Sequence, residues 1–241
     1  HPERPIVFLS ACYFFVSIGY LIRIGVGHEQ VACEGPIIRY SLSGANICSL
    51  VFLLVYFFGM ASSLWWIVLS LTWFLAAGLK WGNEAIAGYA QYFHLIAWLV
   101  PTFQTIAVLI SRAVDGDPVS GICYVGNMNM KNLRIFVLVP LCIYLVIGTT
   151  FLIAGFVSLF RIRKVIKKQD CAGAISKADK LEKLMIRIGI FSVLYTVPAS
   201  IVIGCHLYEN AYHRDWMQAV ACSCPGSKNT DATMRPIYSI L

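Results

Sequence analysis

The sequence has little charge and, over one long stretch, none. Charged residues make up 13% of the 241 positions and hydrophobic residues 59%, with a mean hydropathy of +0.72. No charged side chain occurs between Ile47 and Leu79, a run well beyond the roughly 20 residues that a helix needs to cross a bilayer. This composition excludes an ordinary soluble globular domain and predicts a polytopic membrane protein.

The common catalytic and nucleotide-binding motifs are also missing. There is no His-Glu-x-x-His, no Gly-x-Ser-x-Gly and no phosphate-binding loop. Asp and Glu are absent from the centres of the apolar segments, which disfavours proton-coupled transporters and cation channels, and no internal repeat supports a transporter. We therefore expect neither an enzyme nor a cofactor. The net charge of +7 does not indicate nucleic acid, because the basic residues fall mainly in one connection between two apolar segments.

What the sequence does have is five apolar segments of membrane-spanning length. A helix is the expected form for each, because an open strand would leave backbone polar groups unpaired in lipid. Pro101, Pro140 and Pro198 predict kinks whose freed carbonyls are satisfied by neighbouring helices. The expected fold is an all-α membrane bundle. Its spans are expected at residues 6–24, 47–79, 92–110, 135–160 and 186–207.

The segment 47–79 is expected to be the centre of this bundle. Its small residues would let other helices approach closely, while its tryptophans add bulk to the packing. The small residues are Gly59, Ala61, Ser62 and Ser63, and the large ones are Trp65, Trp66 and Trp73. On the third span, His94 and Gln104 are expected to hydrogen-bond to other helices rather than to a ligand.

Basic residues give the expected orientation. The connection 161–185 is rich in Lys and Arg, so it is expected in the cytoplasm together with the amino end and the turn 80–89. Segments 25–46, 111–134 and 208–237 are then extracellular, and the charged residues of 111–134 are expected to form a solvated loop. These are Arg112, Asp115, Asp117, Lys131 and Arg134. The basic connection either sets topology alone or also binds acidic lipid headgroups or an acidic protein.

The basic residues in question are Arg161, Arg163, Lys164, Lys167, Lys168, Lys177, Lys180 and Lys183. Nearby, Arg187 lies within an apolar run, where an unpaired guanidinium is costly. It is therefore expected either to extend to the membrane surface or to bind a partner inside the bundle.

Cysteines provide an independent indication of sidedness. Cys33, Cys48 and Cys123 lie in or beside the expected outer loops, Cys222 and Cys224 lie in the outer tail, and Cys205 is close to it. A Cys48–Cys123 bridge would fasten the second outer loop over the bundle, with a stabilisation of about 2–4 kcal/mol. We favour this bridge over two unpaired thiols. A metal cluster of Cys222, Cys224, His206 and His213 is disfavoured because the spacing matches no zinc pattern.

Several blocks of the sequence resemble the membrane domain of Frizzled receptors. They are Pro2–Ile6, Tyr56–Ile86, Tyr92–Trp98, Cys123–Asn127 and Asp179–Ala199. Further blocks at 82–88, 114–118 and 157–163 are most similar to the branch containing Frizzled five and Frizzled eight. The resemblance implies a class F, seven-helix receptor bundle. The chain would then be a fragment from the second helix to the start of the seventh, with five complete transmembrane helices and no cysteine-rich domain.

The resemblance also implies partners and residue roles. Members of this family lie in the plasma membrane, bind Wnt proteins mainly through the cysteine-rich domain, and signal to Dishevelled in the β-catenin and planar polarity pathways; a G protein is a further implied partner. Cys48 and Cys123 match the family's bridge, Arg187 matches a switch residue on the sixth helix, and Lys80 and the basic connection match loops implicated in Dishevelled contact.

Three alternatives or departures accompany this resemblance. Met185–Phe191 is shared in part with Smoothened-like transducers of Hedgehog signals. A shortened chain of this kind could instead pair with intact receptors and blunt their signalling, because the cysteine-rich domain and the Lys-Thr-x-x-x-Trp adaptor motif are absent from it. The missing upstream part is also an expected source of a partner for Cys33.

Overall fold

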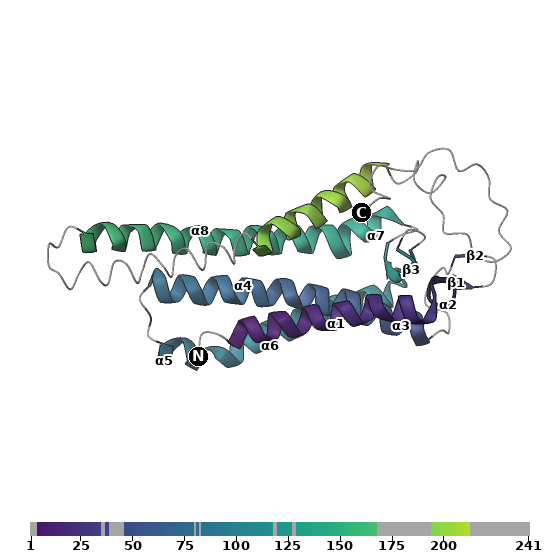
Figure 1. Cartoon of the computed structure of the whole chain (residues 1–241), viewed down its shortest axis with the longest axis horizontal. Helices are drawn as coiled ribbons and strands as arrows, with labels where there is room; N and C mark the ends of the chain where they lie inside the picture. Colours follow the sequence, from purple (N-terminus) through teal and green to yellow (C-terminus); the bar gives the residue numbers. More distant parts are fainter. Residues whose placement is uncertain are drawn as a thin grey trace.

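The computed structural model describes residues 4–34, 37–38, 46–79, 81, 83–117, 120–126, 129–167 and 194–212. Long helices run along one axis, and short strands gather at one end of it (Figure 1). We call this the hairpin end. The opposite end carries α5 (Asn83–Gly88) and the last turns of α8 (Val139–Lys167), and we call it the basic end.

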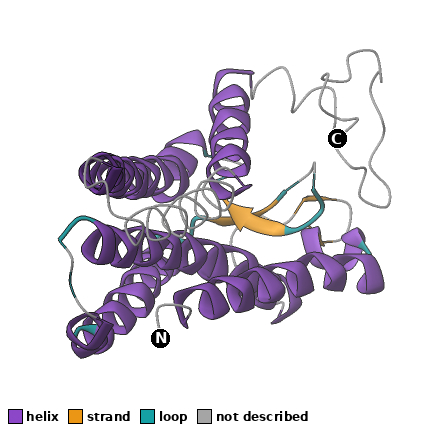
Figure 2. Cartoon of the chain, turned by 60° about the vertical axis from the view of Figure 1, so that its left-hand side comes forward, coloured by secondary structure: helices purple, strands orange, loops and turns teal. Residues whose placement is uncertain are grey.

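Helices make up most of the described chain, as Figure 2 shows. In chain order, the remaining elements are α1 (Arg4–Val26), α2 (His28–Ala32), β1 (Cys33–Glu34), β2 (Ile37–Ile38), α3 (Asn46–Phe52), η1 (Leu53–Phe57), α4 (Phe58–Ala77), α6 (Ala90–Ile110), β3 (Val114–Gly116), β4 (Cys123–Val125), α7 (Met130–Leu133), η2 (Arg134–Leu138) and the unlabelled helix 194–212. The segments η1 and η2 are wide π-helical turns that join the α-helices on either side.

Four helices among the described residues are long and apolar enough to cross a membrane. They cover Pro5–Val26, Ile47–Ala76, Ala90–Ile110 and Met130–Val165, so the first four predicted segments are helices of spanning length. The fifth predicted span, 186–207, lies partly outside the described residues; its described part is helical and continues to Tyr212.

The predicted end of the fourth span at residue 160 is wrong. The helix continues to Lys167, which places Arg161, Arg163 and Lys164 on a helix rather than in a connection. Lys and Arg are good helix formers, and their long side chains carry the charge away from an apolar helix axis, so basic residues do not end the helix. The same span also begins earlier than predicted, at Met130, where the Asn129 side chain accepts a hydrogen bond of 3.1 Å from the Lys131 N–H.

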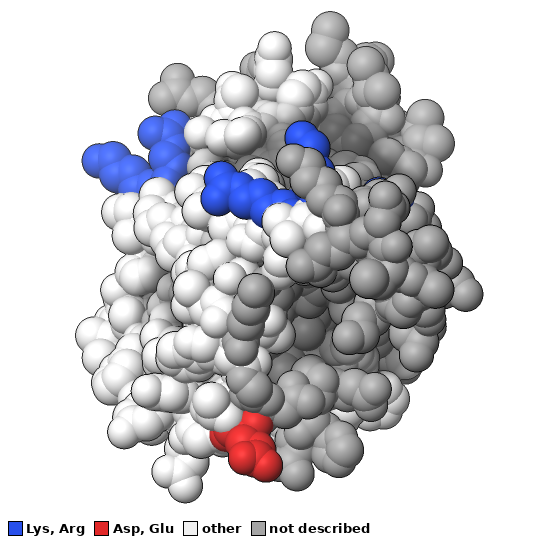
Figure 3. Space-filling view, turned by 90° about the vertical axis from the view of Figure 1, so that its left-hand side faces the viewer, with Lys and Arg blue, Asp and Glu red and all other residues white. Residues whose placement is uncertain are grey.

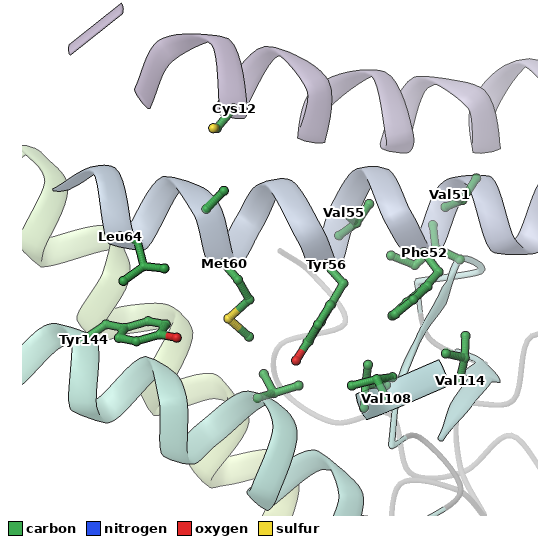
Figure 4. Packing of buried hydrophobic residues seen from close by; sticks show 14 of the residues in the cluster. Cys12, Val51, Phe52, Val55, Tyr56, Met60, Leu64, Val108, Val114 and Tyr144 are labelled. Atoms are coloured by element: carbon green, nitrogen blue, oxygen red, sulfur yellow. The ribbon is translucent and has the colours of Figure 1, made fainter. Parts of the chain in front are cut away.

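The predicted central position of α4 is confirmed. It contacts α1, α6 and α8, and the apolar side chains of α3, η1 and α4 point toward several neighbouring elements (Figure 4). Ala61, Ser62 and Ser63 are buried as expected. Gly59 differs: a Cβ there would meet nothing within 4 Å, so this glycine does not mediate a close approach between helices.

The closest approach is made instead by two glycines of α8. A Cβ at Gly148 would overlap the ring of Trp66, and a Cβ at Gly155 would overlap the ring of Trp73. Because the two tryptophans and the two glycines have the same spacing along their helices, each ring lies over one glycine. This Trp–Gly seam fixes how α4 and α8 pack, since dense interiors leave no room for additional atoms.

The two π-helical turns meet at a hydrogen bond. Pro140 has no N–H, so the carbonyl of Phe136, one turn earlier, lacks its usual helical donor. The hydroxyl of Tyr56 in η1 donates to this carbonyl at 2.7 Å. The expectation that a neighbouring helix satisfies the carbonyl freed by a proline is confirmed at Pro140.

Two small antiparallel hairpins form the hairpin end. In the first, Cys33 pairs with Ile38; in the second, Gly116 pairs with Cys123 and Val114 with Val125. The expectation of a solvated loop over 111–134 is wrong for Asp115, which is only 3% exposed. The second hairpin packs onto the bundle because β4 follows a tight turn and is attached to α3 by a disulfide.

Candidate functional site

A cavity of about 240 Å³ lies between α1, α4, α8 and helix 194–212. Its wall is largely apolar, but residues with hydroxyl groups line it from four helices. These are Tyr13 of α1, Ser62 and Ser63 of α4, Tyr144 of α8 and Tyr195 of helix 194–212. A small apolar cavity with a few convergent hydrogen-bonding groups is the usual form of a ligand site.

The hydroxyl groups lie close to one another. Tyr13 neighbours Ser62 and Tyr195, and Tyr195 neighbours Ser63. The Ser62 and Ser63 hydroxyls donate to the Gly59 carbonyl of their own helix at 2.7 Å and 3.3 Å. The Tyr195 ring also stacks on Trp66, with ring centroids 4.5 Å apart. This cluster therefore brings polar groups of α1, α4 and helix 194–212 together. The sequence reading treated the serines as packing residues and did not single out the tyrosines; hydroxyls recurring at the same depth in separate spans were the available signal.

Gln104 and His94 on α6 lie in different surroundings. The Gln104 amide donates to the Tyr144 hydroxyl of α8 at 2.7 Å, which confirms the expected hydrogen bond between helices. His94 packs edge-on against Phe8 and Trp65, with centroid distances of 4.8 Å and 4.9 Å. Its described contacts are thus with aromatic rings.

Tyr124 and His206 line the same cavity at the hairpin end. Their rings are nearly parallel, at an interplanar angle of 4° and a centroid distance of 6.5 Å. His206 Nδ1 lies 3.4 Å from the Glu209 carboxylate on the same helix. Burial raises the pKa of the Tyr124 hydroxyl above its ordinary value, so this group is a neutral hydrogen-bonding phenol at neutral pH.

A second contact holds the end of helix 194–212. Arg134 Nε, in η2, donates to the Asn210 side-chain oxygen at 2.6 Å. Arg134 is exposed as expected, but the expectation that it lies in a loop is wrong, because η2 extends the fourth span toward this helix.

The predicted bridge between Cys48 and Cys123 is confirmed, with Cα atoms 5.3 Å apart. Cys33 is also disulfide-bonded within this chain, so the expectation of a partner in an upstream segment is wrong. Cys205 is an exposed free thiol, and Cys12 and Cys142 are free thiols on α1 and α8. Cys222, Cys224 and His213 lie outside the described residues.

Comparison with known proteins gives a match along the whole chain. The model of the Frizzled/Smoothened family membrane region matches residues 1–241. Frizzled-2 of Drosophila melanogaster is 67% identical over 241 residues, covering 100% of this chain and 34% of the relative. Frizzled-5 of Xenopus laevis is 63% identical, covering 100% and 42%, and human Frizzled-8 is 54% identical, covering 100% and 40%.

The chain belongs to the Frizzled family. It is a Frizzled-type membrane bundle, and it spans well under half the length of these relatives. The resemblance to the branch of Frizzled five and Frizzled eight is confirmed by the identities with both.

The basic end of this Frizzled bundle carries several of the predicted partner residues. Arg161 and Lys164 are exposed on α8, Arg163 is partly buried, and Lys167 ends the helix. Figure 3 views this end and shows Lys and Arg side chains gathered on one part of it, with acidic side chains at the opposite edge. Lys80, Lys168, Lys177, Lys180, Lys183 and Arg187 lie outside the described residues.

Proposed function

We propose that this chain is the signal-transmitting membrane core of a Frizzled receptor for Wnt proteins. The observation that carries the proposal is the family match over residues 1–241. It is supported by the separation of the disulfide-bonded hairpins from the basic turns of α8 at opposite ends of the helices. A bundle with different ends suits a protein that receives a signal on one side of a membrane and delivers it on the other.

In this proposal, the hairpin end lies outside the cell and the basic end lies in the cytoplasm of a plasma-membrane protein. Wnt is bound mainly by parts of the receptor beyond this chain, and the change is passed through helix packing rather than by chemical catalysis. The basic residues of α8, with the connection that follows, supply a surface for Dishevelled and for a G protein. The exposed side chains of Arg161 and Lys164 support a role in binding an acidic partner surface.

The test is a signalling assay of the full-length protein in cells without endogenous Frizzled receptors. Wnt should activate a β-catenin reporter and recruit labelled Dishevelled to the membrane. Activation of a Hedgehog reporter, with no Wnt response, would favour the Smoothened-like alternative instead. Expressing this chain beside intact receptors tests whether it pairs with them and blunts their signalling, because such pairing would reduce the Wnt response.

Charge reversal then tests the basic end. The double variant Arg161→Glu and Lys164→Glu should strongly reduce Dishevelled recruitment while leaving surface expression unchanged. Lys131→Glu is the matched control because Lys131 is exposed on α7 at the hairpin end. If the double variant, the Lys131→Glu control and the unmutated receptor recruit Dishevelled equally, the two α8 residues do not belong to the partner surface.

A further inference from the structure

Among the aromatic contacts of the described residues, a single pair of rings connects the second hairpin with helix 194–212. Tyr124 of β4 lies parallel to His206 of the helix. The Tyr124 ring also contacts the ring of Tyr56 in η1, with centroids 6.0 Å apart at an interplanar angle of 64°. Tyr124 is therefore placed between the central helix and helix 194–212.

The hairpin is itself firmly held on its other side. Cys123, next to Tyr124, is bonded to Cys48 of α3, and Tyr56 is 1% exposed with its hydroxyl on the Phe136 carbonyl. Any displacement of β4 must therefore move against a disulfide and against the contact of Tyr124 with the immobilised Tyr56 ring. On this side the hairpin and the central helix behave as one body.

Helix 194–212 has much weaker packing within the described chain. The Leu194 side chain is 68% exposed and that of Ile201 is 59% exposed. Ile203 is the apolar residue of this helix that is buried within the described chain. Because the helix buries little apolar area, its position depends largely on specific contacts at its ends. At the hairpin end these contacts include the Tyr124–His206 stack and the Arg134–Asn210 hydrogen bond.

We propose that Tyr124 and His206 form the joint through which the β3–β4 hairpin sets the position of the hairpin end of helix 194–212. The Arg134–Asn210 bond limits the same movement from the side of η2. A partner that displaces the hairpin would then move this helix directly, without first rearranging the Trp–Gly seam. The meaning of the joint for signalling rests on the proposed receptor function; the mechanical coupling does not.

The test measures a distance distribution in the purified full-length protein in lipid nanodiscs. Spin labels are placed at positions 120 on the hairpin turn and 211 on the helix, after Cys205→Ser removes the exposed free thiol. His206→Leu should broaden the distribution, because it removes the stacked ring from a partly buried site. His206→Phe should restore a narrow distribution because it keeps an aromatic ring there.

A double-mutant comparison separates a joint from two independent defects. Tyr124→Ala should broaden the distribution to a similar extent as His206→Leu, and the two changes together should add nothing further. Tyr124→Phe should match the unmutated protein. Ile201→Ala, on an exposed part of the same helix, is the control for loss of side-chain volume and should also leave the distribution narrow.

An unchanged distribution in His206→Leu, or additive broadening in the double variant, would overturn the proposal. His206→Leu and His206→Phe keep the experiment decisive if Tyr124→Ala does not fold, because neither alters the hairpin. A failed Wnt response with normal distances would contradict the proposed function and leave the joint standing. Normal Wnt signalling, with no change of the distance distribution in the variants, would support the proposed function and overturn the joint.

Discussion

The two ends of the bundle are built in different ways. At the hairpin end, strands, a disulfide, an Arg–Asn hydrogen bond and stacked rings connect elements far apart in the sequence. At the basic end, α8 extends past the bundle and presents Arg161 and Lys164 to solvent. The first arrangement restricts movement, and the second leaves charge accessible. The contrast shows that specific contacts between distant segments are concentrated at the hairpin end, whereas the basic end leaves charged side chains exposed.

The largest expected effect on stability comes from the Trp–Gly seam, which packs α4 against α8 between the two ends. Gly148→Ala would place a methyl group inside the Trp66 ring, and Gly155→Ala would do the same at Trp73. Overpacking typically costs about 1–3 kcal/mol and more in severe cases. Because the added carbon would lie far inside van der Waals contact with the Trp66 ring and with the Trp73 ring, both variants should exceed that range and show lower surface expression and a lower melting temperature of the purified receptor.

The matched control for the seam is Gly204→Ala. A Cβ at Gly204 meets nothing within 4 Å, and alanine is the better helix former. Its melting temperature should equal or exceed that of the unmutated protein. Equal losses in all three variants would show that helical glycines matter here for a reason other than the tryptophan rings.

Loss of the disulfide should weaken the hairpin end alone. Replacing Cys48 and Cys123 together by Ala removes the bridge and should cost about 2–4 kcal/mol. Hydrogen exchange should accelerate over residues 120–126 and remain unchanged in α5 and the last turns of α8. Cys205→Ser is the control, since Cys205 is a free thiol; uniform acceleration along the bundle would contradict a local role.

A smaller effect is expected from Tyr56→Phe. The change removes the hydroxyl that donates to the Phe136 carbonyl in a partly buried site, at a cost of about 1–3 kcal/mol. The melting temperature of the receptor should fall by several degrees. Tyr92→Phe removes a hydroxyl from a residue that is 62% exposed and should change nothing measurable.

The smallest effect on stability is expected at the basic end. Replacing Arg161 and Lys164 by Glu should shift the free energy of unfolding by no more than about 0.5 kcal/mol, because exposed charges contribute little. The same double variant is the one expected to lose Dishevelled recruitment. A large fall in thermal stability would instead assign these residues a structural role and would remove the contrast between the two ends.

Much of the fold follows from local features of the sequence. Long uncharged runs predict the spans, and the placement of Cys48 and Cys123 in neighbouring expected outer segments predicts their bond. Gln104 could be assigned to a hydrogen bond between helices because lipid provides no alternative partner. These predictions needed only the chemistry of a side chain and the solvent around it.

The remaining features depend on how distant segments face one another. Tyr56 and Phe136 are 80 residues apart, and no pattern around either residue indicates that two π-helical turns meet there. The importance of Gly148 and Gly155 appears only once Trp66 and Trp73 are placed over them. Likewise, the stacking of Tyr124 on His206 requires the angle of helix 194–212, which side-chain packing sets.

The most direct test of the central claim compares two lysines on intact cells that express the full-length protein. A membrane-impermeant amine reagent is followed by mass spectrometry of the peptides containing Lys131 and Lys164. The account predicts labelling of Lys131 on intact cells and of Lys164 only after permeabilisation. Labelling of Lys164 on intact cells, with Lys131 protected, would contradict it.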